Sequence, residues 1–154
     1  MNSDTQRLET FISSLPNFIS LSVADRRALV MALELRSFSP GDVLIEQGDK
    51  GDGAYFLLSG TLKVELVHKG AIEDLGTLET GALFGVLAMV DGRPRAASCI
   101  ATTPGEAAFL SRSAFNMLAH GQASIAYPFQ RAIGAQIAKN FRSVVRTIRG
   151  QLST

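Results

Sequence analysis

The 154-residue sequence has one cysteine and no long apolar run. Cys99 alone cannot form an internal disulfide and has no partner at metal-ligand spacing, so we interpret it as a small buried hydrophobic residue in a strand. The most apolar run, residues 81–90, has about half of the roughly 20 residues that a membrane-spanning helix needs. The N-terminus also lacks the basic start and apolar stretch of a secretory signal. These absences predict a cytoplasmic protein without a membrane span.

Acidic residues are absent from the end of the chain. The last one is Glu106, and six arginine or lysine residues follow it, although the net charge of the whole chain is only +1. A basic C-terminal segment is typical of a contact with nucleic acid or an anionic surface, or of a solvated helix face that complements an acidic body. The charge pattern alone leaves these interpretations open, and we favour the solvated face.

Sequence patterns of catalysis and metal binding are missing too. No Gly-x-Ser-x-Gly or His-Glu-x-x-His motif occurs, and no pair of acids marks a cleft. Residues 48–53 include two aspartates but lack the other oxygen ligands of a calcium loop, so we interpret them as a solvated turn. His68 and His120 are the only histidines, and we expect both on the surface. We therefore expect neither an enzyme, nor a metal site, nor a cofactor.

A single domain with three zones fits the length and the 46% hydrophobic content. We expect an N-terminal helical segment over residues 1–37, a β-roll over 38–111 and C-terminal helices over 112–154. The predicted fold class is α+β: an antiparallel β-roll, which is a jelly-roll-like double-stranded β-helix, flanked by N-terminal helices and a long C-terminal helix.

Local patterns place the elements of the first two zones. Ser22 can cap a helix whose apolar residues continue to Leu35 at helical spacing, and Pro40 is expected to end this helix near residues 37–40. Short apolar runs separated by glycine follow, and several alternate with polar neighbours, as half-buried strands do. The strands are expected at residues 43–45, 55–58, 62–66, 72–78, 98–103 and 107–110. The turn signals between them are spaced as in a small antiparallel roll.

Two helices are expected after the roll. The first covers residues 113–120 and is closed by Gly121, and the second begins near Pro128 and is ended by Gly150. The second helix carries an apolar stripe at steps of three and four, which consists of Phe129, Ile133, Ile137, Phe141, Val144 and Ile148. The stripe either packs onto the roll or forms the seam of a two-helix dimer, and we favour a homodimer through this helix.

Residues 84–98 have the composition of a phosphate site. Gly85 permits the close approach of a ligand, and a helical turn that begins there points unpaired backbone N–H groups at an anion. Arg95 offers a fork of donors to a phosphate, while the two alanines that follow it keep side-chain bulk away. The alternatives for Arg95 are a surface charge and an internal ion pair with a nearby acid.

The same segment resembles the phosphate-binding cassette of cyclic-nucleotide-binding domains, of the type found in the catabolite activator protein and the regulatory subunit of protein kinase A. The stretches Phe-Gly-Val-Leu-Ala at 84–88 and Pro-Arg-Ala-Ala-Ser at 94–98 follow the family's spacing, and the resemblance covers about residues 10–150. It implies a ligand-binding set that consists of Phe84, Gly85, Val86, Leu87, Ala88, Arg95, Ala96, Ala97 and Ser98.

Two positions shape what the resemblance implies about the ligand. The family's glutamate, which accepts a hydrogen bond from the ribose 2′-hydroxyl, is replaced by Val86, which has no acceptor. Family members that prefer cyclic GMP often carry threonine directly after the arginine, whereas Ala96 stands there in this chain and favours cyclic AMP.

The resemblance implies one of two functions. The first is a stand-alone cyclic-nucleotide sensor that relays binding through its C-terminal helix to an effector protein or a second copy. The second is a degenerate fold that no longer binds nucleotide and acts as a dimerisation or protein-interaction module. Direct DNA binding is not expected, because no helix-turn-helix follows the long helix in this sequence.

Overall fold

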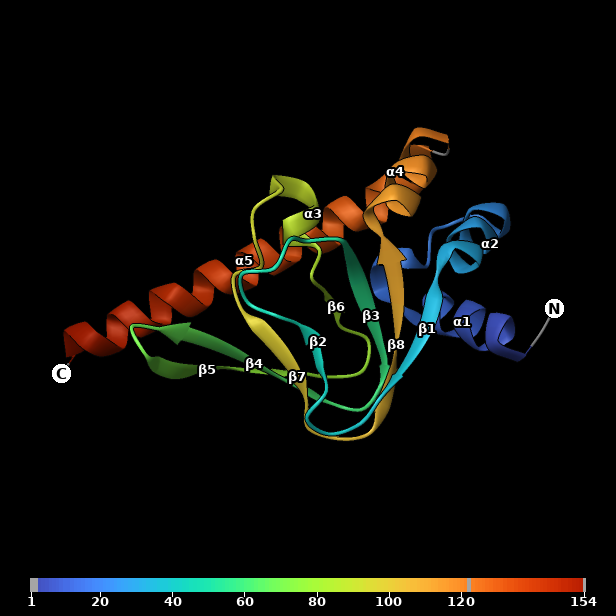
Figure 1. Cartoon of the computed structure of the whole chain (residues 1–154). Helices are drawn as coiled ribbons and strands as arrows, with labels where there is room; N and C mark the ends of the chain where they lie inside the picture. The colour runs from blue at the N-terminus through green and yellow to red at the C-terminus, as the bar shows by residue number, and fades with distance from the viewer. Residues whose placement is uncertain (1–2, 122, 154) are drawn as a thin grey trace.

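The computed structural model describes residues 3–121 and 123–153, with helices at both ends of the chain and a β-roll between them (Figure 1). The helices are α1 (Ser3–Ser14), the single 3-10 turn η1 (Pro16–Phe18), α2 (Val23–Ala32), α3 (Leu87–Asp91), α4 (Arg112–Gly121) and α5 (Ala123–Ser153). The strands are β1 (Glu34–Phe38), β2 (Val43–Ile45), β3 (Gly53–Ser59), β4 (Leu62–His68), β5 (Ala71–Leu78), β6 (Leu83–Phe84), β7 (Ser98–Ala101) and β8 (Gly105–Ser111). Within these described ranges, none of the helices has the length and apolar character needed to cross a membrane.

The strands form two antiparallel four-stranded sheets, in the orders β1-β8-β3-β6 and β2-β7-β4-β5. Apolar side chains from both sheets, among them Leu57, Leu62 and Phe109, form one core cluster between them. Each of the predicted strand runs contains a strand, so the predicted α+β roll is confirmed. Strand β6 lies outside the predicted runs, because two residues are too few to show an alternation.

A second core cluster lies between the sheet that contains β3 and the flanking helices. Leu8 and Ile12 of α1, Leu29 of α2 and Phe129 of α5 are buried against Phe56 of β3. At the start of α2, the Ser22 hydroxyl accepts a hydrogen bond from the Asp25 N–H at 3.1 Å, which confirms the predicted cap. The helices of both termini therefore share one face of the roll.

The helix that the sequence predicts to end near residues 37–40 ends at Ala32 instead. Residues Glu34–Phe38 form β1, which pairs antiparallel with β8. The Arg36 guanidinium stacks 3.9 Å above the centroid of the Phe109 ring on that partner strand. Pairing with a strand far away in the sequence decides the conformation here, so the local helical spacing is misleading.

Helix α5 is longer than predicted: it begins before Pro128 and continues beyond Gly150. Proline lacks one backbone donor, but this part of the helix is fixed by its packing: Ile125 and Phe129 are fully buried, and the Phe129 ring meets rings of η1 and α4 edge-on. The sequence predicts that Gly121 directly follows the first C-terminal helix, whereas in the structure Gly121 is the last residue of α4.

The second half of α5 extends past the edge of the roll (Figure 1). Ile137 is 54% exposed and Ile148 is 49% exposed. The side chains of Phe141 and Val144, which belong to the predicted stripe, lie outside the described part of the structure. The beginning of the stripe therefore packs against the rest of the domain, whereas Ile137 and Ile148 present apolar side chains to solvent.

Candidate ligand-binding site

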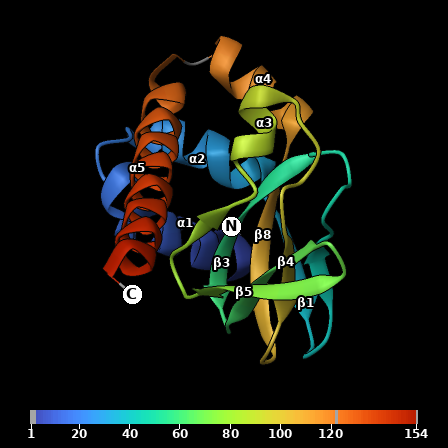
Figure 2. The same cartoon turned by 90° about the vertical axis from the view of Figure 1, so that its left-hand side faces the viewer.

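The segment between β6 and β7 forms a loop and the short helix α3 at the end of the roll where α4 lies (Figure 2). Gly85 follows β6 with a φ of +77°, a conformation that favours glycine. A Cβ atom at this position would lie 2.9 Å from Nη1 of Arg95 and 2.9 Å from a side-chain carbon of β2. The sequence predicts glycine here for the approach of a ligand, and the structure shows that the Arg95 side chain is the group that approaches.

Arg95 is buried, with only 7% of the residue exposed. Its Nη1 donates to the Gly85 carbonyl at 2.5 Å and its Nη2 donates to the Gly53 carbonyl at 2.6 Å. Nη2 also lies 3.4 Å from Oδ1 of Asp52, whose side chain is 76% exposed. The interpretation of Arg95 as a surface charge is therefore wrong, and the internal ion pair is present. A carboxylate that remains in solvent offsets only part of the cost of burying a guanidinium.

Arg95 lines a cavity of about 280 Å³, and every predicted site residue except Ser98 lines it too. Ser98 begins β7, and its hydroxyl accepts a hydrogen bond from the Gln47 backbone N–H at 2.9 Å. The other lining residues are Ile45, Val64, Leu78, Leu83, Asp91, Pro94, Cys99 and Gln136. Segments that are distant in the sequence thus meet around the guanidinium.

The cavity wall is mostly apolar. Asp91, Arg95 and Gln136 carry the only charged or amide side chains among the described residues that line it. Val86, which is 2% exposed, supplies no hydrogen-bond acceptor. Burial raises the pKa of the Cys99 thiol to about 11, and the positive charge of Arg95 offsets this rise in part. The thiol is therefore neutral at physiological pH, as expected for a buried hydrophobic residue.

The loop that contains Asp52 is more than the solvated turn that the sequence predicts. Gly51 and Gly53 are buried, and a Cβ atom on Gly51 would overlap the Cβ of Ala88 in α3. The loop is packed against the cassette helix and supplies two of the three acceptors of Arg95. The dense glycine spacing was the only sequence signal of this close packing.

Helix α5 also reaches the cavity, through Gln136. Sequence reasoning misses this residue because a glutamine between apolar and basic neighbours is typical of any exposed helix face. Its presence means that a ligand in the cavity would lie against the long C-terminal helix. Among the described residues no cluster of histidine, cysteine, aspartate or glutamate is suited to a metal ion.

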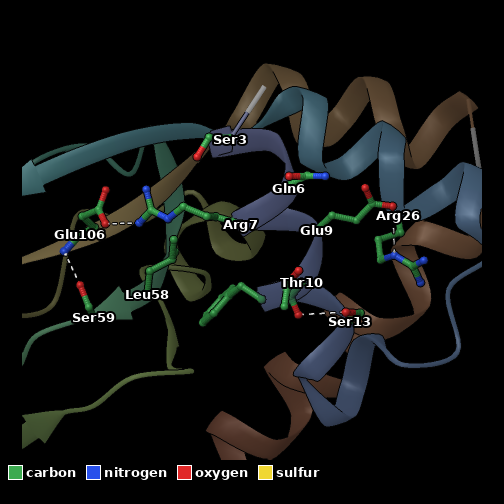
Figure 3. A pocket seen from close by; sticks show the side chains of 11 residues that line it. Ser3, Gln6, Arg7, Glu9, Thr10, Ser13, Arg26, Leu58, Ser59 and Glu106 are labelled. Atoms are coloured by element: carbon green, nitrogen blue, oxygen red, sulfur yellow. Dashed lines mark hydrogen bonds and ion pairs between the residues drawn. The ribbon is translucent and has the colours of Figure 1, made fainter. Parts of the chain in front are cut away.

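A larger and more open groove of about 800 Å³ lies between α1 and the ends of β3 and β8 (Figure 3). Its charged side chains are paired: Arg7 forms an ion pair with Glu106, and Arg26 lies 3.7 Å from Glu9. The predicted site residues do not line this groove.

A buried arginine, a tightly packed glycine loop and a mostly apolar cavity between the β-roll and its helices are typical of a ligand-binding domain of the β-roll class. The sequence profile of the cyclic nucleotide-binding domain matches residues 35–121, which is more than half of the chain. The chain belongs to this family.

Relatives of the chain are regulatory subunits of a protein kinase. A cAMP-dependent protein kinase regulatory subunit of Hypocrea atroviridis is 39% identical over 110 residues, which are 71% of this chain and 23% of the relative. The type II regulatory subunit of Drosophila melanogaster is 39% identical over 111 residues, which are 71% of this chain and 29% of the relative. The chain thus spans about a quarter of the length of these relatives.

Solved structures share the fold. A cyclic nucleotide-binding domain from Methylobacillus flagellatus superposes with a TM-score of 0.80 at 22% identity, over 93% of this chain and 83% of that chain. The regulatory domain of Toxoplasma gondii protein kinase A with cAMP gives a TM-score of 0.69 at 25% identity, over 77% of this chain and 45% of that chain. The predicted fold class is confirmed by these matches.

Proposed function

We propose that this chain is a cytoplasmic regulatory domain, without enzymatic activity, that binds cyclic AMP in preference to cyclic GMP in the cavity beside Arg95. The observation that carries the proposal is the buried guanidinium in the wall of a cavity that is otherwise mostly apolar. The names of the relatives, which are cAMP-dependent regulatory subunits, support the same choice of ligand.

The phosphate is the part of the ligand that Arg95 recognises. A guanidinium carries five N–H donors, and three of them are directed at the Gly85 carbonyl, the Gly53 carbonyl and the Asp52 carboxylate. The cyclic phosphate carries a full negative charge. It gives Arg95 a second anionic partner beside the largely exposed carboxylate of Asp52. Because Arg95 is desolvated before the ligand arrives, little further desolvation of the guanidinium opposes binding.

Binding is relayed through α5 because this helix supplies Gln136 to the cavity wall. A ligand that contacts Gln136 favours one position of the helix over others, and the difference in affinity for these positions sets the size of the response. The output is a changed surface on the second half of α5, which acts on an effector protein or a second copy of the chain rather than on DNA.

Val86 limits the affinity in this proposal. A hydrogen bond to a charged acceptor contributes about 1.5–3 kcal/mol, so a valine at this position weakens binding of a ribose 2′-hydroxyl roughly 10- to 150-fold. The titration should therefore extend to nucleotide concentrations that detect weak binding.

Isothermal titration calorimetry with cyclic AMP and cyclic GMP tests the proposal. We expect heat of binding for both and the lower dissociation constant for cyclic AMP. The absence of heat at millimolar concentrations of either nucleotide would rule out the sensor.

A second candidate function is a dimerisation module whose pocket has lost its ligand. Two observations favour it: Arg95 already has internal acceptors, and Ile137 and Ile148 are exposed on α5. In that case nucleotide leaves the melting temperature unchanged, light scattering reports a dimer, and Ile137→Glu converts it into a monomer. A monomeric parent chain would exclude this candidate.

A further inference from the structure

The basic residues of α5 lie on one face of the helix, which we call its basic face. All of them are exposed, and they are Arg131, Lys139, Arg142, Arg146 and Arg149. At about 100° of rotation per residue, these five positions fall within an arc of roughly 80° around the helix axis. No acid interrupts the face, because Glu106 is the last acidic residue of the sequence. The helix therefore presents a continuous row of positive charge to solvent.

Acidic side chains of the same chain do not neutralise the middle of the basic face. None of the ion pairs between described residues involves Lys139, Arg142 or Arg146. Like charges three and four positions apart on a helix repel one another, and this repulsion lowers the stability of the helix. An anionic partner that lies along the face offsets this cost.

The opposite face of the second half of α5 is apolar. Ile137 is 54% exposed and Ile148 is 49% exposed, and both lie roughly 150° from the centre of the basic face. This half of the helix extends past the edge of the roll (Figure 1). A helix with lysine and arginine on one face and large apolar residues on the other is typical of helices that lie in the plane of a membrane surface.

The remainder of the chain has the opposite charge. Residues 1–106 contain nine lysine or arginine residues and 14 aspartate or glutamate residues, whereas residues 107–154 contain six basic residues and no acid. An anionic surface therefore attracts α5 and repels the first 106 residues taken together. These two forces favour one orientation of the molecule, with α5 on the surface and the roll away from it.

We infer that α5 binds the surface of a membrane that contains anionic lipids. Ile137 and Ile148 enter the boundary between headgroups and acyl chains, while the long basic side chains extend to the lipid phosphates. Nucleic acid is the other common partner of a basic helix, but it uses only the charge and leaves both isoleucines in water. The lipid surface is the partner that uses both faces. The inference needs no bound nucleotide, so it is tested separately from the proposed function.

Co-sedimentation of the whole chain with lipid vesicles tests the role of the basic face. The parent chain is expected to bind vesicles of phosphatidylcholine mixed with phosphatidylserine, to release them as salt is raised, and not to bind phosphatidylcholine alone. The double variant Arg142→Gln/Arg146→Gln is expected to bind roughly 30-fold more weakly, because two charges near the lipid surface are lost. The control Lys50→Gln/Arg93→Gln removes the same charge from two exposed positions of the roll and is expected to bind as the parent does.

Tryptophan fluorescence tests the role of the apolar face. The chain has no tryptophan, so a single introduced one reports on its own surroundings. The emission of Ile137→Trp is expected to shift to shorter wavelength when anionic vesicles are added. Ile72→Trp is the matched control at an isoleucine of β5 that is 68% exposed, and its emission is expected to stay unchanged. All the substituted side chains are exposed, and circular dichroism checks that the variants keep the fold.

Three results overturn the inference: no binding of the parent to anionic vesicles, equal losses in the two double variants, or an unchanged emission of Ile137→Trp on vesicles. The last result is also expected if a second copy of the chain covers the isoleucines. Binding of a fluorescent DNA duplex without binding of vesicles assigns the basic face to nucleic acid instead. Each of these results leaves the proposed function in place, because calorimetry with cyclic AMP tests that proposal without lipid.

Discussion

The cavity beside Arg95 and the groove beside α1 both contain arginine side chains, but they satisfy those charges differently. In the groove Arg7 meets the carboxylate of Glu106, and Glu9 lies within 4 Å of Arg26, so positive charge is matched by acids (Figure 3). In the cavity Arg95 is buried against two carbonyls and one largely exposed carboxylate.

This difference outweighs the difference in size. The groove is larger, at about 800 Å³ against about 280 Å³, but the two arginines that line it each lie within 4 Å of a carboxylate that also lines it. The smaller cavity keeps an incompletely neutralised cation among apolar walls, which is the condition under which an anion gains most from binding. On this ground we propose the smaller cavity, rather than the larger groove, as the ligand site.

The largest expected effect is on ligand binding, when the arginine of the cavity and the arginine of the groove are replaced separately. Arg95→Met removes the charged partner of the phosphate and is expected to weaken cyclic AMP binding by about 2–5 kcal/mol, or roughly 30- to 4,000-fold. Arg7→Met, the matched change in the groove, is expected to leave the dissociation constant unchanged. Titration calorimetry on both variants measures the contrast, and equal losses would refute it.

Local sequence information is enough to place several residues of the candidate site in one cavity wall. Gly85 and Arg95 stand at a fixed spacing in one segment, and both line the cavity. The wall formed by Ile45, Val64 and Gln136 comes from three other segments, and no local pattern indicates that these side chains meet.

The errors in the predicted fold have the same physical cause. Strand β1 follows its partner β8 rather than its own helical spacing, and the start of α5 follows the burial of Ile125 and Phe129 rather than the preference of Pro128. Tertiary contacts override local propensity at these places, whereas the Ser22 cap depends on neighbours three residues away and is predicted correctly.

A smaller effect should follow from adding an acid to the cavity. Val86→Glu places a carboxylate beside the ligand and is expected to strengthen cyclic AMP binding roughly 10- to 150-fold, because the ribose 2′-hydroxyl gains a charged acceptor. Calorimetry with 2′-deoxy cyclic AMP is the control, since this ligand has no hydroxyl to donate. If both ligands gain equally, the role assigned to position 86 is wrong.

Glycine substitutions separate backbone strain from contact with Arg95. Both Gly85 and Gly92 have positive φ, but a Cβ atom at Gly85 meets Nη1 of Arg95, whereas at Gly92 nothing lies within 4 Å. Gly92→Ala is expected to cost about 1 kcal/mol of unfolding free energy, and Gly85→Ala about 1–3 kcal/mol more. Urea unfolding measures both free energies. Equal costs would show that the Arg95 side chain moves away from the new Cβ atom without a measurable loss of stability.

The smallest expected effect is on the reactivity of Cys99. Because burial raises its pKa to about 11, only a small fraction of the thiol is ionised at pH 8, and alkylation by iodoacetamide is expected to be slower than in the urea-unfolded chain. Bound phosphate cancels part of the Arg95 charge that favours the thiolate, so cyclic AMP should slow alkylation further. Mass spectrometry follows the reaction, and a rate equal to that of the unfolded chain contradicts the burial.

A crystal structure of the chain grown with cyclic AMP tests the central claim most directly. The account predicts the cyclic phosphate in the cavity, with an oxygen within hydrogen-bond distance of Nη1 or Nη2 of Arg95 and the base toward Gln136. An empty cavity at saturating nucleotide, with Arg95 still bound only to the Gly85 and Gly53 carbonyls and to Asp52, would contradict it.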